Sequence, residues 1–101
     1  MCVPNYEIIV ATEVFGDFYG AGVLGLGPDP QGTGIVRKLF EIGEIQAAKV
    51  GLNFEYSDDL TSKSVVTFGY LNEQEIVGGE SQMDFYDNLD TDFWALTMND
   101  L

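Results

Sequence analysis

The segment Gly22-Val23-Leu24-Gly25-Leu26-Gly27-Pro28 constrains the fold of this chain more than any other part of it. Glycine and apolar side chains alternate there more tightly than in an ordinary surface loop. Val23 and Leu24 form an apolar pair that is typical of a buried strand. Gly25 and Gly27 remove side chains where the backbone must pass close to another segment. The pattern predicts a buried strand that enters a tight turn, with Gly25 packed against a neighbour.

The composition favours a single domain, or part of one, with an acidic surface. The 101 residues are 46% hydrophobic, which is enough for a core of moderate size and argues against disorder throughout. Seventeen acidic residues and four basic ones give a net charge of −13. This charge argues against nucleic acid and anionic membranes as partners. An acidic compartment would relieve the self-repulsion, although a merely soluble surface is the simpler interpretation.

Several classes of chemistry need residues that this sequence lacks. Cys2 is the single cysteine and histidine is absent, which excludes an internal disulfide, histidine-ligated zinc, and serine-histidine or cysteine-histidine catalysis within the chain. No stretch of about 18 apolar residues predicts a membrane span, and the first residues do not resemble a signal peptide. We expect no metal and no cofactor.

One short helix is predicted in the first half of the chain. Apolar side chains fall at helical spacing over 35–42, and the charged residues between them point the other way. Gly43 supplies a stop, and Thr33 is a candidate cap at the start.

The rest of the chain has the residue pattern of strands and turns. Turn residues recur about every ten positions, which favours a mainly β architecture with one helical crossing. The predicted strands share β-branched, aromatic or alternating apolar residues: 6–14, the short strand at 23–24, 50–56, 64–68, 83–86 and 93–98. Residues 57–63 form the polar turn of a hairpin between two of them.

Four elements follow one another in a distinctive order. They are the Gly22–Pro28 segment, a helix that ends at Gly43-Glu44-Ile45, a hairpin that ends in Val66-Thr67-Phe68-Gly69, and the aromatic pair Phe93-Trp94. This order resembles the pepsin-like aspartic proteases, in which Asp-Gly-Ile-Leu-Gly-Leu precedes a helix, a Phe-Gly-Gly strand and a Tyr-Trp pair. Because the strand at 8–14 also resembles the family, the similarity covers nearly the whole chain.

The resemblance implies a mainly β fold with one short helix that is part of a pepsin-like bilobal acid-protease fold. Residues 1–80 would be the later part of an N-terminal lobe, and residues 81–101 the interlobe connection and the start of the next lobe's strands. In the family, the glycine-flanked strand passes beside the loop that carries a catalytic aspartate. Leu24 and Gly25 would therefore support that loop, and Val23 would form part of the wall of the substrate cleft.

The catalytic machinery of the family is missing from this sequence. Each lobe of such an enzyme contributes an Asp-Thr/Ser-Gly triplet, because two carboxylates that share one proton activate water. Asp90-Thr91-Asp92 begins like a triplet, but Asp92 stands where glycine should allow the turn. The chain also departs from the family at three positions, Ala21, Tyr70 and Asn72. No catalytic residue is assigned within this chain.

Two other interpretations of the motifs are weaker. Asp84, Asp87, Asp90 and Asp92 suggest a calcium site, but they lack the glycine and the terminal glutamate of the usual loop. The glycines around Gly25 break the dinucleotide fingerprint at its third glycine, and no Gly-Lys-Ser/Thr phosphate loop is present. Calcium and nucleotides are therefore not expected as ligands.

Two functions of different classes follow from the sequence. The first is a segment of a pepsin-like aspartic endopeptidase, secreted or endolysosomal by resemblance, that meets a peptide or protein substrate only when the rest of the fold completes it. The second is a non-catalytic relative whose open sheet edges serve as a docking surface.

Overall fold

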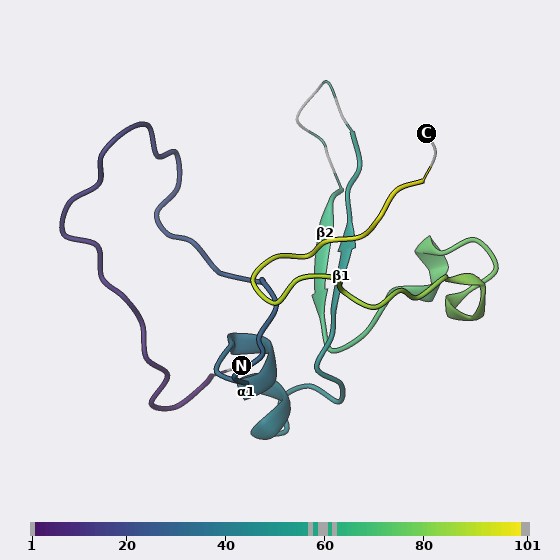
Figure 1. Ribbon diagram of the computed structural model, residues 1–101, viewed down its shortest axis with the longest axis horizontal. Coiled ribbons are helices and arrows are strands. Elements are labelled where there is room, and N and C mark those ends of the chain that lie inside the picture. Colours follow the sequence, from purple (N-terminus) through teal and green to yellow (C-terminus); the bar gives the residue numbers. More distant parts are fainter. Residues whose placement is uncertain (1, 57, 59–60, 62, 100–101) are drawn as a thin grey trace.

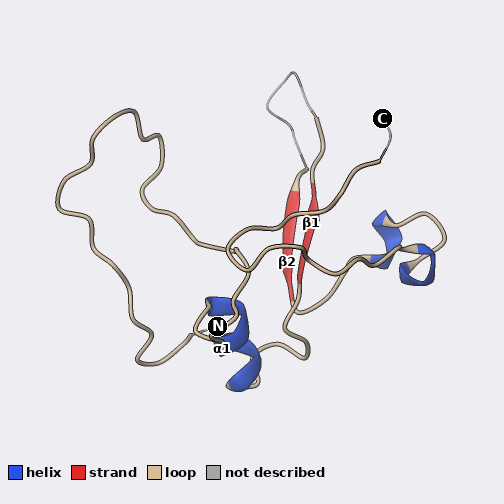
Figure 2. Ribbon diagram, in the orientation of Figure 1, coloured by secondary structure: helices blue, strands red, loops and turns tan. Residues whose placement is uncertain are grey.

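Regular secondary structure is confined to the middle of the chain. The computed structural model describes residues 2–56, 58, 61 and 63–99. Its elements, in chain order, are helix α1 (Ile35–Glu41), strands β1 (Val50–Asn53) and β2 (Val65–Phe68), and the 3-10 helices η1 (Glu73–Glu75) and η2 (Glu80–Gln82). Figure 1 shows a long open loop that precedes helix α1 in the chain, and Figure 2 shows in tan that most of the chain lies in loops and turns. One short helix and one antiparallel pair of strands agree with the predicted class at this coarse level.

None of the helices in the described part of the chain has the length and apolar character needed to cross a membrane.

Helix α1 begins after a turn that Asp29 organises. The Asp29 carboxylate accepts hydrogen bonds from the backbone N–H groups of Thr33, at 2.8 Å, and Gly34, at 2.9 Å. Gly34 is the residue that precedes the helix, and no side chain of its own can cap the end. The predicted cap, Thr33, is wrong, because its own N–H group is a donor to Asp29 and its side chain does not accept from the helix.

The end of helix α1 is a Schellman motif. Gly43 has a φ of +81°, and its N–H group donates to the carbonyl of Phe40. The N–H group of Glu44 donates to the carbonyl of Leu39 at 3.0 Å. These are the two bonds by which such a motif satisfies the last carbonyls of a helix, and glycine accepts the left-handed conformation without a side-chain penalty. The predicted stop at Gly43 is confirmed.

Strands β1 and β2 form the predicted hairpin over a shorter range. Their register pairs Val50 with Phe68 and Asn53 with Val65. A side chain at Gly51 would collide with the hydroxyl of Thr67, so the pair can approach closely only with glycine there. Beyond the strands, the hydroxyl of Tyr56 donates to the carboxylate of Asp58, and this hydrogen bond raises the pKa of Tyr56.

The buried side chains of the described structure lie where the helix meets the hairpin. Among the described residues, only the hydrophobic side chains of Leu39 and Ile45 are buried, at 5% and 7% exposure. Gly69 lies against Ile45, because a Cβ atom built on Gly69 would stand 2.7 Å from the Cβ of Ile45. Gly69 has a φ of +88°, and its N–H group donates to the carbonyl of Lys49 at 2.8 Å. This contact ties the end of β2 to the segment that follows α1.

Around this small core the chain is much more open than a folded domain. The radius of gyration is 16.5 Å, whereas a compact domain of this length has about 13 Å. The accessible surface is 9238 Å², whereas a folded protein of this mass exposes about 5,700 Å². The excess is apolar to a large extent, because side chains such as Ile9, Tyr19 and Val77 are more than nine-tenths exposed.

Several predicted strands are not formed. The segments 6–14, 23–24, 83–86 and 93–98 have strand-like composition but contain no strand in the structure. A strand is stable only when a neighbouring strand satisfies its backbone groups, and none of these segments is paired with a strand in the described part of the chain. The backbone bond from Leu89 to the carbonyl of Ala95 belongs to a loop and does not extend into a strand pair. The prediction of these strands is therefore wrong for this chain.

The contact between Gly69 and Ile45 predicts a large effect of one methyl group. Gly69→Ala forces alanine into the left-handed region and against Ile45, so the free energy of unfolding should fall by roughly 2 kcal/mol or more. Urea titration followed by circular dichroism measures the change. Gly25→Ala is the matched control, because no atom lies within 4 Å of its added Cβ and its φ is not positive. An equal loss in both variants would contradict the packing described here.

The turn before α1 gives a second prediction. Asp29→Ala removes the acceptor of two backbone N–H groups and should lower the free energy of unfolding by about 1 kcal/mol. Thr33→Ala leaves both hydrogen bonds in place and should change it by less than about 0.5 kcal/mol. Thermal unfolding of both variants, followed by the circular dichroism signal of the helix, measures the two changes. A larger loss of stability in Thr33→Ala than in Asp29→Ala would show that Thr33 is the cap.

Candidate functional site

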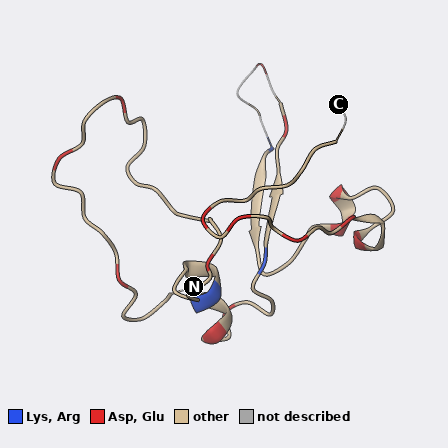
Figure 3. Cartoon of the chain, in the orientation of Figure 1, with Lys and Arg blue, Asp and Glu red and all other residues tan. Residues whose placement is uncertain are grey.

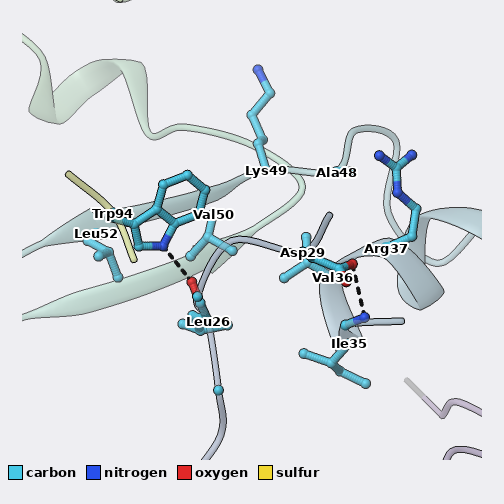
Figure 4. Close-up of a pocket in the computed structure, with 13 residues that line it drawn as sticks. Leu26, Asp29, Ile35, Val36, Arg37, Ala48, Lys49, Val50, Leu52 and Trp94 are labelled. Carbon is cyan, nitrogen blue, oxygen red and sulfur yellow. Dashed lines mark hydrogen bonds between the residues drawn. The ribbon is translucent and has the colours of Figure 1, made fainter. Parts of the chain in front are cut away.

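An open cavity of about 620 Å³ lies where four separate segments approach one another. The segments are the glycine-rich segment 25–27, the first turn of α1, strand β1, and the C-terminal stretch that holds Trp94. Figure 4 shows their side chains around the cavity. The apolar lining residues are Leu26, Ile35, Val36, Val50, Leu52 and Trp94. A site of this kind fits an apolar group or a segment of polypeptide.

One hydrogen bond joins the glycine-rich segment to the C-terminal stretch at the cavity. The indole Nε1–H group of Trp94 donates to the carbonyl of Leu26 at 2.7 Å, as Figure 4 shows. The backbone of Asp92 lies close by, because its carbonyl is 3.8 Å from a Cβ built on Gly27. Two of the four elements that carry the family resemblance therefore lie in contact, although they are far apart in the sequence.

The three predicted site residues lie at or beside this cavity but are not buried. Val23 is 82% exposed and Leu24 is 59% exposed, so the prediction of a buried strand is wrong here. Gly25 lines the cavity, and no atom lies within 4 Å of its Cβ position. The described chain thus contains no segment packed against Gly25. The roles of Val23 in a cleft wall and of Leu24 and Gly25 in supporting a catalytic loop remain predictions.

Asp90 organises a loop and does not stand in a catalytic pair. Its carboxylate accepts from the N–H groups of Asp92, at 2.7 Å, and Phe93, at 3.2 Å. The side chain of Asn88 completes the loop, because its amide donates to the carbonyl of Phe93 and accepts from the N–H group of Ala95. The loop positions Trp94, which is the residue that bonds to Leu26.

The charged groups near the cavity are engaged in local contacts. The Asp29 carboxylate accepts from the turn before α1, Lys49 pairs with Glu80 at 3.4 Å, and Arg37 lies 5.9 Å from the ring centre of Phe40. Asp29 is the single carboxylate among the described residues that line the cavity, so this lining offers no aspartate dyad for general acid–base chemistry. Among the described residues no group of three or more acidic or cysteine side chains could hold a metal ion.

Sequence reasoning missed two features of this site. An aromatic residue such as Trp94 is more often part of a core than exposed, whereas Trp94 is 69% exposed and its indole N–H group donates to the carbonyl of Leu26. Asp29 stands between two prolines, five residues before Gly34, and short acidic side chains in such turns commonly accept from the backbone that follows. That signal was available for Asp29. No local signal could pair Trp94 with Leu26, because 68 positions separate them.

Comparisons with protein-family models, with curated proteins and with solved structures find no match to this chain. Its function must therefore be argued from its own residues.

The hydrogen bond between Trp94 and Leu26 can be tested through the size of the molecule. Trp94→Phe keeps an aromatic ring but removes the donor, which should cost about 1 kcal/mol and release the C-terminal stretch. The radius of gyration from small-angle X-ray scattering should rise above that of the unmodified chain. Tyr86→Phe is the control, because Tyr86 is also exposed and has no side-chain hydrogen bond in the described structure. An unchanged radius in Trp94→Phe would show that this bond does not hold the two segments together.

Proposed function

We propose that this chain is a segment of a pepsin-like aspartic endopeptidase. Peptide-bond hydrolysis would be carried out by an aspartate dyad that lies outside these 101 residues. The chain would supply the later part of the N-terminal lobe, over 1–80, and the connection between lobes, over 81–101. Its substrate would be a peptide or protein chain bound in a cleft that other segments complete.

The observation that carries this proposal is the convergence of separate elements on one uncovered cavity. The glycine-rich segment, the start of α1, strand β1 and Trp94 all line it. All four belong to the ordered set on which the family resemblance depends. The space beside Gly25 is open, and in the family a catalytic loop packs at the corresponding glycine. The arrangement is therefore compatible with a socket that receives a further segment.

The exposed apolar surface supports the same proposal. A chain that exposes roughly 3,500 Å² more than a folded protein of its mass is not stable as an independent globule on burial alone. A larger fold would cover this surface and supply partners to the strand-like segments that lack them. The acidic charge of −13 would be reduced at the low pH at which aspartate dyads work.

A docking module is the second candidate. The two-stranded sheet has an unpaired outer edge on each side in the described part of the chain. Unpaired edges and exposed apolar side chains favour association with another chain. Under this proposal the chain binds a partner and performs no hydrolysis.

The enzyme proposal is tested by extending the reading frame on both sides of these residues. We expect an Asp-Thr/Ser-Gly triplet on each side, and hydrolysis of a peptide substrate by the extended protein at acid pH that pepstatin inhibits. The isolated 101 residues should show no such activity. Absence of both triplets from the flanking sequence, or pepstatin-sensitive turnover by the isolated chain after repurification, would contradict the proposal.

Gly25 provides a matched control for that experiment. In the extended protein Gly25→Ala should reduce turnover, because its methyl group would meet the catalytic loop. In the isolated chain the same change should leave stability within about 0.5 kcal/mol, since nothing lies within 4 Å of it. Equal stability and full activity of the extended variant would argue against a catalytic loop beside Gly25.

A further inference from the structure

Strand β2 has an outer edge whose backbone groups are unpaired. Gly69 donates to the carbonyl of Lys49, so the odd-numbered residues of β2 direct their backbone groups toward β1. The N–H and C=O groups of Val66 and Phe68 are therefore directed away from β1. In the described part of the chain these groups form no backbone hydrogen bond outside the hairpin. Such an edge is a template for a further strand.

The segment 6–14 has the composition of a strand and no partner. Ile8, Ile9 and Val10 are 73%, 98% and 75% exposed. The segment runs through the open loop that Figure 1 shows to one side of the molecule. β-branched residues in succession are favourable in a paired strand and costly in water. Segment 6–14 therefore lacks a strand partner, and so does the outer edge of β2.

Charges on the segment and on the hairpin have the same spacing. Glu7 and Glu13 are six positions apart, so the alternation of a strand places them on one face. Lys63 stands six positions before Gly69, and Lys49 lies opposite Gly69 in the hairpin. If the alternation of β2 is extended to residue 63, these two lysines lie on one face, one near each end of the hairpin. Figure 3 shows basic residues in blue near both ends of the hairpin. Lys49 and Lys63 are half of the four basic residues in a strongly acidic chain.

We infer that segment 6–14 of one copy pairs antiparallel with the outer edge of β2 in a second copy. Glu13 then lies opposite Lys63. Glu7 lies opposite Gly69, on the face that also carries Lys49, whose Nζ atom is already paired with Glu80 at 3.4 Å. The charge attraction in this register therefore comes from Glu13 and Lys63. Between these ends, Thr12 lies opposite Ser64, and four further cross-strand pairs are apolar or β-branched: Ile8 with Phe68, Ile9 with Thr67, Val10 with Val66, and Ala11 with Val65. Pairs of these types stabilise neighbouring strands.

A second copy fits this edge better than the chain's own segment. The open loop that contains 6–14 is bonded to the rest of the molecule near both of its ends. The hydroxyl of Tyr6 donates to the carbonyl of Thr33, and the carbonyl of Leu26 accepts from the indole N–H group of Trp94. These bonds hold the segment in a loop outside its own sheet. Exchange between two identical chains is reciprocal, so it forms two such pairings in one two-fold symmetric dimer. Each partner of a stable interface needs to bury about 800 Å², and the excess exposed surface is several times larger.

This inference rests on the docking candidate and names its partner. The net charge of −13 per chain opposes association in general. Alignment of Glu13 with Lys63 places opposite charges against each other at this edge. A dimer formed in this way does not require hydrolytic activity.

Charge reversal tests the pairing by sedimentation of the 101-residue chain at moderate ionic strength. The unmodified chain should form a dimer. Glu13→Lys should weaken the dimer about tenfold, because each dimer contains the pair twice, and Lys63→Glu should weaken it similarly. The double variant should bind within about threefold of the unmodified chain. Asp17→Lys is the control, since it changes the net charge as Glu13→Lys does but lies beyond the paired segment, so the dimer should not weaken.

Cross-linking separates exchange between copies from folding back within one. In the Cys2→Ser background, chains with Ala11→Cys are mixed with chains with Val65→Cys, because these positions form a close, non-hydrogen-bonded pair in the proposed register. A disulfide-linked dimer of the two kinds of chain is expected. Ile9→Cys with Val65→Cys, two positions out of register, should cross-link much less. A monomer at all concentrations, equal weakening by Glu13→Lys and Asp17→Lys, or cross-linking only within a chain that carries both cysteines would overturn the inference. None of these outcomes affects the peptidase test on the extended protein.

Discussion

The contact of Gly69 with Ile45 is the constraint on which the ordered part of this molecule depends. It joins the segment that follows helix α1 to the end of the hairpin, and it tolerates no side chain at Gly69. The Schellman motif at Gly43 turns the chain so that Ile45 reaches this position. The bond from Gly69 to Lys49 then fixes the hairpin beside it. Helix, turn and strands thus support a core in which Leu39 and Ile45 are the buried side chains of the part of the chain that the structure describes.

Outside this small core, many large apolar side chains are exposed, because no other described segment covers them. Burial of two side chains contributes only a few kcal/mol, and strand-like segments without partners gain nothing from their composition. The hydrogen bond from Trp94 to Leu26 brings distant segments together around a cavity without closing it. A larger aspartic-protease fold and a second copy of the chain are two different ways in which such surface can be covered.

The sequence predicted what depends on local chemistry. Helical spacing and Gly43 defined α1, and alternation defined the hairpin, because neighbouring residues determine both. The strand predicted over 6–14 failed because a strand depends on a distant partner that its own residues do not specify. The same limit applies to the site: the glycine-rich segment was recognised as unusual, but its bond to Trp94 depends on tertiary structure. The exposure of Val23 shows that an apolar pair is buried only when something is present to cover it.

Residue-resolved hydrogen exchange of the isolated chain in dilute solution tests the central claim most directly. If the contact of Gly69 with Ile45 organises the structure, the slowest amides should be those of Glu44, at the end of α1, and Gly69, at the end of β2, since both donate to backbone carbonyls at this core. The amides of 7–25 should exchange at nearly the rate of an unfolded chain. Rapid exchange at Gly69 together with protection over 7–25 would contradict the account.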